Sequence, residues 1–260
     1  MSTKQIQGKL WSVAPTYWSQ HFEPCFLPMY KKVLGQLKLT EDTLLLDAGC
    51  GAGLFSSMAI DAGAQVIGID AASGLLEVAR QRNPDNNFME EDIEALPFAD
   101  NGFDVVTGFN SFQYAGDFEK ALREARRVLN KNGRLVIGIW DKPELSQATE
   151  VLKAIGSLLP PPPPGTPGPF ALSEDGAIET IINKIGMTLT YKTTVGCPLF
   201  YTKLGDGVKS FMGTGPAAAA CNHAEEKKVK EIIAQALQPF LVANEFYHLQ
   251  NQFLVFIAEK

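Results

Sequence analysis

Basic stretches, long apolar runs and paired cysteines are all scarce in this chain of 260 residues, and each shortage excludes a class of protein. The 23 Lys and Arg are scattered among 29 Asp and Glu, so neither nucleic acid nor an anionic membrane is expected as a partner. No run approaches the roughly 18 consecutive apolar residues that a membrane-spanning helix needs. The polar first residues also lack the apolar core of a secretory signal peptide.

Cysteine and histidine are rare as well. The four cysteines stand far apart, form no CxxC pair and have no histidine nearby at metal-ligand spacing. The sequence therefore predicts neither a disulfide framework nor a zinc site, and no metal is expected. Free thiols are typical of a reducing compartment, so we expect a cytoplasmic protein. The cysteines are Cys25, Cys50, Cys197 and Cys221.

Apolar residues are plentiful by contrast, at 45% of the chain, and they suffice for a sizeable core. The length favours one domain with embellishments. We expect a single domain over residues 1–260, with a helical N-terminal cap at 1–40, a ligand-binding core at 41–142 and a C-terminal part at 143–260. A homodimer is compatible with this composition.

Short apolar runs alternate with amphipathic segments from residue 43 onward. This alternation is typical of a doubly wound, mostly parallel α/β sheet, for which we expect seven strands. The strands carry few polar residues, as expected where helices cover both faces. Strands are predicted at 43–47, 65–69, 87–90, 103–109, 133–140, 188–195 and 246–258, and helices at 54–62, 73–81 and 118–129.

The alternation lapses after residue 140. A helix is predicted at 144–159, and another, capped by Ser173, carries an apolar face at 177–185. The proline-rich stretch 160–169 cannot be helix or central strand, and we expect it to border a substrate entrance. A ligand for a proline-binding module is the alternative. A late helical insertion is expected at about 197–243, with helices at 204–212 and 224–241.

A glycine-rich loop follows the first predicted strand. Gly49, Gly51 and Gly53 alternate with other residues, and Asp47 stands two residues before the first glycine. Such glycines allow a tight turn and a close approach of the backbone to a ligand. The next helix offers free N–H groups and a partial positive charge to a carboxylate or phosphate. The spacing differs from the dinucleotide fingerprint, although a nicotinamide-dependent oxidoreductase stays an alternative.

The segment Asp47-Ala48-Gly49-Cys50-Gly51-Ala52-Gly53 resembles the first motif of class I S-adenosylmethionine (SAM)-dependent methyltransferases, position for position. Segments at 67–70, 91–98, 103–106 and 129–135 continue the resemblance in family order over about residues 40–140. Within this superfamily the chain is similar to small-molecule enzymes such as quinone-biosynthesis methyltransferases. The resemblance implies a Rossmann-like methyltransferase fold, SAM as cofactor, S-adenosylhomocysteine as product, and no metal.

The resemblance also implies where SAM would bind. The methionine end would lie over the glycine loop, and Asp70 would accept hydrogen bonds from both ribose hydroxyls, since an ionised carboxylate only accepts. Asp92 and the backbone of Ile93 would meet the adenine, and Asn110 the methionine amino group. Asp70 as a helix cap and Asp92 as plain surface are the alternatives. The cofactor-binding set is Asp47, Gly49, Cys50, Gly51, Gly53, Asp70, Ala71, Asp92, Ile93, Asn110, Tyr17 and Trp18.

The segment after the fourth strand is the best candidate for the acceptor side. Gln113 and Tyr114 stand where many relatives have histidines, so a histidine base is not expected there, and both are predicted to orient a polar acceptor. His21 is a further candidate for the acceptor side, and His248 the only other plausible histidine base. Tyr17 and Trp18 would present aromatic faces to the sulfonium. Loop packing is the alternative for Tyr114.

The predicted function is methyl transfer from SAM to a small molecule by in-line SN2 displacement, with the acceptor atom unassigned. The sulfonium is a good leaving group, so the enzyme mainly positions the acceptor and excludes water. Three alternatives stay open. They are a SAM-binding protein without turnover, the nicotinamide-dependent oxidoreductase, and a methyltransferase acting on protein or RNA, the last disfavoured for RNA by the acidic charge.

Overall fold

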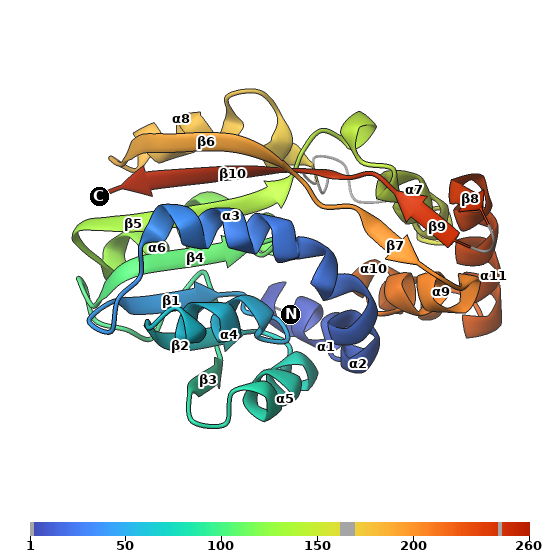
Figure 1. Ribbon diagram of the computed structural model, residues 1–260, viewed down its shortest axis with the longest axis horizontal. Coiled ribbons are helices and arrows are strands. Elements are labelled where there is room, and N and C mark those ends of the chain that lie inside the picture. The colour runs from blue at the N-terminus through green and yellow to red at the C-terminus, as the bar shows by residue number, and fades with distance from the viewer. Residues whose placement is uncertain (1–2, 162–169, 244–245) are drawn as a thin grey trace.

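The computed structural model describes residues 3–161, 170–243 and 246–260, and a twisted seven-stranded sheet runs through its centre (Figure 1). Four neighbouring pairs of strands are parallel, and the last long strand runs antiparallel to both of its neighbours. The predicted α/β sheet is therefore confirmed. Its order is β3 (Asn87–Glu90), β2 (Gln65–Asp70), β1 (Leu44–Ala48), β4 (Phe103–Phe109), β5 (Leu129–Trp140), β10 (Gln252–Glu259) and β6 (Thr188–Gly196).

Two hydrophobic cores lie on opposite faces of this sheet. Because side chains alternate along a strand, Leu45 enters one core and Leu46 the other. On the first face lie α3 (Leu27–Leu37) and α4 (Leu54–Asp61). On the second lie α6 (Phe118–Val128) and α8 (Ala177–Lys184), whereas α5 (Ser73–Arg82) packs at the β3 edge. Burial on both faces explains the nearly unbroken apolar strands.

The N-terminal segment crosses the end of the sheet where β1, β2 and β4 finish. It consists of α1 (Thr3–Trp11), α2 (Pro15–Tyr17), a π-helical turn at Trp18–Phe22 and a 3₁₀ turn at Glu23–Phe26. Pro15 and Pro24 occupy the first positions of their turns, where a missing N–H costs nothing. The predicted N-terminal helices are thus present, and they cover the edge at which ligands bind in open α/β sheets.

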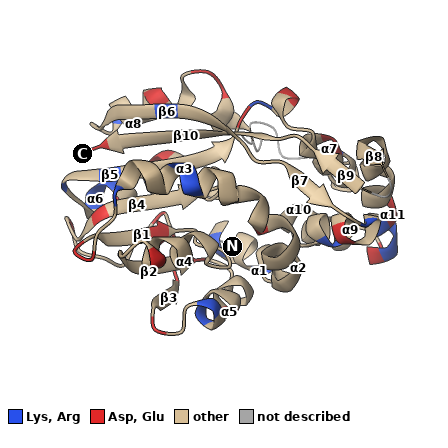
Figure 2. Cartoon of the chain, in the orientation of Figure 1, with Lys and Arg blue, Asp and Glu red and all other residues tan. Residues whose placement is uncertain are grey.

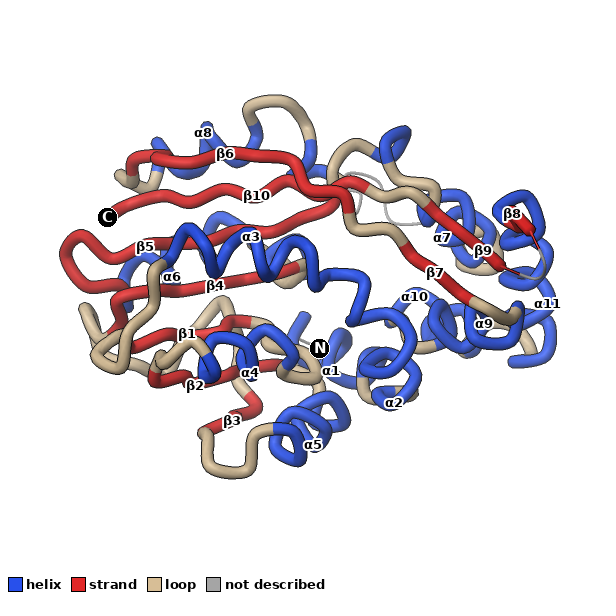
Figure 3. Tube along the Cα trace, in the orientation of Figure 1, coloured by secondary structure: helices blue, strands red, loops and turns tan. Residues whose placement is uncertain are grey.

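A second lobe lies beyond that edge, as the tube in Figure 3 shows. It holds α7 (Ala148–Gly156), α9 (Leu204–Met212), α10 (Gly215–Cys221) and α11 (Glu226–Leu237). A three-stranded antiparallel sheet, ordered β7 (Leu199–Tyr201), β9 (Phe246–Leu249) and β8 (Leu241–Ala243), completes it. Short 3₁₀ turns lie at Pro143–Leu145, Phe112–Tyr114, Ala171–Ser173 and Gln238–Phe240.

Several predicted boundaries change in this lobe. The strand predicted at 246–258 splits into β9 and β10, because buried Asn251 turns the chain and accepts a hydrogen bond from Ala148 N at 2.9 Å. Ser173 does not cap α8: its hydroxyl donates to the Trp140 carbonyl, and Gly176 is the cap residue. Of the predicted proline border, residues 162–169 lie outside the described residues.

Charges are spread over the whole ribbon. Lys and Arg lie interspersed with Asp and Glu (Figure 2). In the described part of the chain no helix is long and apolar enough to cross a membrane.

Candidate functional site

The glycine loop joins β1 to α4, and its three glycines do different things. All three have positive φ, at 80°, 55° and 77° for Gly49, Gly51 and Gly53, where only glycine is unstrained. A Cβ on Gly49 would collide with Ser111, and one on Gly53 would press on Ala79 at 2.9 Å. Nothing comes closer than 3.5 Å at Gly51. Gly49 and Gly53 therefore serve close packing, whereas at Gly51 a side chain would meet only ordinary contacts and the positive φ alone requires glycine.

Asp70 ends β2 directly beside this loop. Its carboxylate accepts hydrogen bonds from Gly51 N and from Ala72 N, both at 2.8 Å. Burial raises the pKa of Asp70 above its ordinary value, although these backbone donors oppose the rise. Ala72 is the residue before α5, so Asp70 fastens the start of that helix to the glycine loop. The same side chain lines the pocket described next.

A pocket of about 720 Å³, open mouth included, lies between the sheet edge and the N-terminal segment. The structure brings nine of the predicted site residues together in its wall: Gly49, Gly51, Asp70, Ala71, Asp92, Ile93, Asn110, Tyr114 and Trp18. Ten residues outside the predicted set complete the wall: Thr3, Lys4, Gln7, Trp11, Leu75, Glu91, Glu94, Phe109, Ser111 and Ala115.

Helix α1 supplies the missed N-terminal wall. The backbone at Gly8 touches the Ala71 carbonyl so closely that a Cβ would collide with it. Ser12 Oγ accepts from Gly74 N at 3.1 Å, and Lys4 Nζ donates to the Glu90 carbonyl at 3.0 Å. Gly8 was the available signal, since a glycine inside a helix often marks a close contact.

Six predicted site residues are absent from the described pocket wall: Asp47, Cys50, Gly53, Tyr17, Gln113 and His21. Asp47 is buried beneath the loop and accepts hydrogen bonds from Ser56 and Thr107 hydroxyls at 2.7 and 2.9 Å. Burial raises its pKa to about 6. Cys50 packs among apolar side chains, and burial raises its thiol pKa. These two residues hold the loop in place from behind.

Gly53 packs against Ala79, as described above, and the remaining three stand beside the wall. Gln113 donates to Asn110 Oδ1 at 3.0 Å, so the structure places it as a partner of Asn110 rather than on the pocket surface. Asn110 itself adopts a left-handed φ of 50°. The Tyr17 and His21 rings meet edge to face at 6.3 Å. The alternative base, His248, stacks on Phe200 in the small sheet and is likewise absent from the described wall.

Two buried polar atoms in the wall have no partner in the described protein: Trp18 Nε1 and Ser111 Oγ. Trp18 Nε1 lies 3.5 Å from the position that a Gly51 Cβ would take. The Trp18 ring is stacked on Phe22, with centroids 5.0 Å apart, which fixes the direction of its N–H. An unsatisfied buried donor costs about 1–3 kcal/mol, so this N–H favours a ligand that carries an acceptor.

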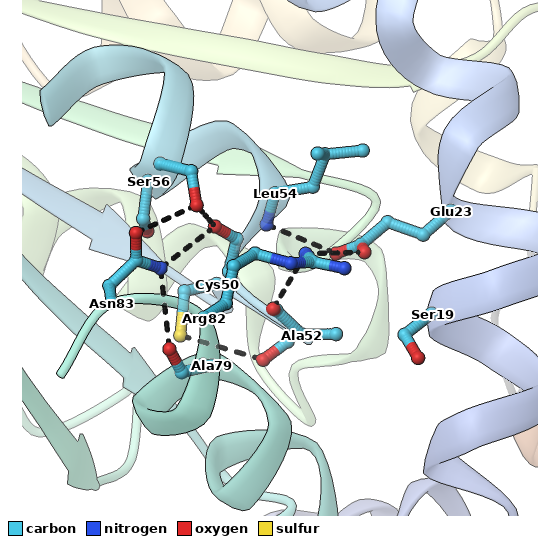
Figure 4. Close-up of polar contacts among 12 residues, drawn as sticks. Ser19, Glu23, Cys50, Ala52, Leu54, Ser56, Ala79, Arg82 and Asn83 are labelled. Carbon is cyan, nitrogen blue, oxygen red and sulfur yellow. Dashed lines mark hydrogen bonds and ion pairs between the residues drawn. The ribbon is translucent and has the colours of Figure 1, made fainter. Parts of the chain in front are cut away.

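An ion pair that sequence reasoning missed ties the glycine loop to the N-terminal segment and to α5 (Figure 4). Glu23 is only 2% exposed and accepts from Arg82 Nη1 at 2.8 Å and from Leu54 N at 3.3 Å. Arg82 also donates to the Ala52 carbonyl at 2.7 Å. Burial raises the pKa of Glu23 to about 7, with Arg82 opposing. Nothing in the sequence distinguishes Glu23 from a surface acid.

The Glu23–Arg82 pair changes the expectation that the start of α4 offers free N–H groups to a ligand. The N–H of Leu54, the first residue of α4, is taken by Glu23. This N–H is therefore not free for a ligand near Gly51, where Trp18 Nε1 and Glu23 Oε1 lie 3.5 and 3.9 Å from the position that a Cβ would take. Among the described residues, no cluster of three or more His, Cys, Asp or Glu is placed to hold a metal ion.

Comparisons with known proteins fit this site. A family model described as a methyltransferase domain matches residues 46–137, which hold the glycine loop, Asp70, Asp92 and Asn110. A demethylmenaquinone methyltransferase from Renibacterium salmoninarum is 39% identical over 99 residues, covering 38% of this chain and 42% of that protein. A malonyl-[acyl-carrier protein] O-methyltransferase from Serratia marcescens is 37% identical over 103 residues, covering 40% of each.

The matched segment spans about two fifths of the length of these relatives. Among solved structures, the [4+2]-cyclase SpnF has the same fold, with a TM-score of 0.64 at 17% identity, over 100% of this chain and 97% of that one. The matched domain and its named relatives confirm the resemblance to class I SAM-dependent methyltransferases that the sequence predicts. Residues 46–137 of this chain thus match a methyltransferase domain and are set in a Rossmann-like α/β fold.

Proposed function

We propose that this protein transfers the methyl group of SAM to a small molecule. The observation that carries the proposal is the pocket, where the glycine loop, Asp70, Asp92 and the unpaired Trp18 N–H line one continuous wall. The matched methyltransferase domain and the names of the relatives support it. Those relatives are named for different acceptors, so the acceptor is assigned from the pocket alone.

The wall residues fit SAM from one end to the other. The adenine would lie against Ile93 and Asp92, and the ribose hydroxyls would donate to Asp70. The methionine half would lie over Gly51, where a carboxylate can accept from Trp18 Nε1. Asn110, held by Gln113, would meet the amino group. The buried donor that lacks a protein partner is thereby satisfied.

The chain's own residues then position the acceptor and exclude water from the reacting atoms. Bound SAM supplies a methyl group on a positively charged sulfur, ready for in-line displacement. Helix α1 covers the pocket and keeps water from the reacting atoms. Burial raises the pKa of Tyr114 to about 12, so at neutral pH its hydroxyl is protonated and donates a hydrogen bond to an acceptor molecule. Placement of the acceptor behind the methyl is the main catalytic contribution.

Two alternatives can be weighed on this structure. A nicotinamide cofactor would need its pyrophosphate at the start of α4, where Glu23 already accepts the Leu54 N–H and adds an acid. A SAM-binding protein that catalyses something else shares every feature of the cofactor half, and the cyclase with this fold shows that the fold does not fix the reaction. Methyl transfer is favoured by the relatives' names.

The finer assignments also belong to this proposal. We propose a cytoplasmic enzyme, because all four cysteines are free thiols and two are buried. A small molecule rather than a nucleic acid is the proposed partner, since basic side chains are interspersed with acids. The single-domain organisation and the homodimer stay predictions.

The test is calorimetric titration with SAM, S-adenosylhomocysteine and NADH, followed by assay of S-adenosylhomocysteine formation. We expect SAM and S-adenosylhomocysteine to bind at micromolar levels and NADH to give no heat. Asp70→Asn should weaken SAM binding by about 10- to 100-fold, since hydrogen bonds to a charged group contribute about 1.5–3 kcal/mol. Glu91→Gln, a change at a neighbouring wall carboxylate, serves as the matched control. Absence of SAM binding by the folded protein would remove the proposal.

A further inference from the structure

The position of the reacting sulfur can be located from the protein, given the proposed function on which this inference rests. Gly51 N donates to the Asp70 carboxylate at 2.8 Å, and the proposed function puts the methionine half over Gly51 and the ribose at Asp70. The sulfur joins those two halves, so it passes beside this pair. Trp18 is the aromatic side chain that lies nearest to Gly51. The methyl group is therefore delivered next to the Trp18 ring.

Three aromatic side chains form the wall at this point. The Trp11 and Trp18 rings meet edge to face at 4.9 Å, and Trp11 meets Tyr114 edge to face at 5.6 Å. The Trp11 indole donates to Gln7 Oε1 at 3.2 Å. It also lies against the Gly215 backbone, where a Cβ would come within 2.7 Å of Trp11 Nε1. The rings are thus fixed in place, and we call Trp11, Trp18 and Tyr114 the aromatic wall.

The rest of the pocket carries negative charge. Asp70, Glu91, Asp92 and Glu94 line it, against the single ammonium of Lys4, which lies 3.8 Å from Glu91. Aromatic faces attract cations, and a cleft lined by one sign of charge concentrates the other. The pocket therefore favours cationic ligands and disfavours anionic acceptors.

The wall also lacks an obvious base in its described part. It contains no histidine, and Tyr114 keeps its proton at neutral pH. The Asp70 carboxylate already accepts two backbone N–H groups, and Glu94 accepts from Gly116 N at 2.6 Å. Asp92 accepts from Glu94 N at 2.9 Å, and Glu91 lies 3.8 Å from Lys4 Nζ. Each of the four wall carboxylates is thus already engaged, which disfavours an acceptor that must lose a proton before attack, such as a phenol. An acceptor with a free lone pair needs no base.

We propose that the acceptor is a tertiary amine and that the aromatic wall binds the quaternary ammonium product. The nitrogen lone pair forms the new bond to the methyl carbon while the carbon–sulfur bond breaks and its electrons stay on sulfur. No proton is released, and the positive charge passes from sulfur to nitrogen. The rings offer no acceptor to an N–H, so they disfavour the protonated, unreactive amine and favour the methylated cation.

The first experiment compares two probes of the same shape on the S-adenosylhomocysteine complex, choline and its uncharged carbon isostere 3,3-dimethylbutan-1-ol. Calorimetry should show choline binding about 5- to 30-fold more tightly, the range expected of a cation–π contribution. Trp11→Leu and Tyr114→Leu should each remove most of that preference. Phe200→Leu, which changes an exposed aromatic outside the pocket, should leave it intact. Equal binding of the two probes by the wild-type protein would overturn the inference.

The second experiment assays turnover with dimethylamino, phenolic and thiol acceptors of matched size. Tertiary amines should be methylated at least tenfold faster than the others. If SAM binds and only phenols or thiols are methylated, the proposed function stands and the amine inference fails. If the variants lose discrimination between SAM and S-adenosylhomocysteine but treat choline and its isostere as the wild type does, the wall serves the sulfonium alone and the inference also fails. Retained thermal midpoints identify variants that are folded.

Discussion

At the scale of single residues, the glycine loop is supported by a buried carboxylate that does not line the pocket. Asp47 has no ion-pair partner in the described structure and rests on two hydroxyl donors, Ser56 and Thr107. Burial therefore dominates and raises its pKa to about 6 from an ordinary 3.8. A folded-state pKa above the unfolded value means stability that is fully present below about pH 4 and is lost as the pH rises through 6.

Asp47→Asn tests this directly. Asparagine keeps the shape of the aspartate side chain and cannot ionise, so the variant does not lose stability as the pH rises. The difference in free energy of unfolding, variant minus wild type, should grow by about 3 kcal/mol in the variant's favour between pH 4 and pH 7. Urea titrations across this range measure it, with Asp42→Asn, an exposed acid, as the control. A difference that stays flat with pH would show that Asp47 titrates normally.

Residue identities were the most predictable part of the site, and their surroundings the least. Gly51, Asp70, Asp92 and Asn110 carry family motifs and do line one pocket. Asp47 and Cys50 carry the same motif yet stand behind the pocket, because Asp47 accepts from Ser56 and Thr107 and Cys50 packs among apolar side chains. Glu23 could not be found at all, since its burial depends on Arg82, 59 residues away.

At the scale of elements, the pair Glu23–Arg82 joins three pieces of the chain: the N-terminal 3₁₀ turn, the start of α4 and the end of α5. Removing one partner of a buried pair leaves the other charge buried without a partner, whereas removing both does not. Arg82→Met should therefore cost about 3 kcal/mol of folding free energy, and adding Glu23→Gln should restore about half of it.

A double-mutant cycle by urea unfolding measures this coupling. The exposed pair Glu119–Arg123 is the matched comparison, and Arg123→Met should change stability by less than about 0.5 kcal/mol. Equal effects at the two pairs would mean that Glu23 is better solvated than its 2% exposure indicates.

Periodicity predicted the sheet and the helices α7, α9 and α11 of the second lobe, but not the lobe's small sheet or α10. The predicted strands at 87–90 and 103–109 coincide with β3 and β4. The small sheet β7–β9–β8 was missed because two of its strands have three residues each, too few to show a pattern. Helix α10 had local signals that sequence reasoning passed over: Thr214 caps it and Pro216 is near its start.

At the scale of the whole molecule, ligand binding should stabilise both faces of the sheet and the cap together. Saturation with S-adenosylhomocysteine at about 100 times its Kd adds about 2.7 kcal/mol to the folded state. For a chain of this length that corresponds to a rise in Tm of about 5–10 °C. Differential scanning fluorimetry measures it, with adenosine as a weaker-binding control. One shifted transition is expected; a shift confined to part of the unfolding signal would show that the cap unfolds separately.

Helix α1 covers the pocket through two close contacts. The Gly8 backbone packs against the Ala71 carbonyl, and Ser12 Oγ accepts a hydrogen bond from Gly74 N. On the proposed function, we expect these contacts to loosen before S-adenosylhomocysteine leaves. The residence time of the product would then depend on how often α1 detaches, which is a property of the cap and not of the bond being made. We expect turnover to be timed in that sense by α1 and Ser12.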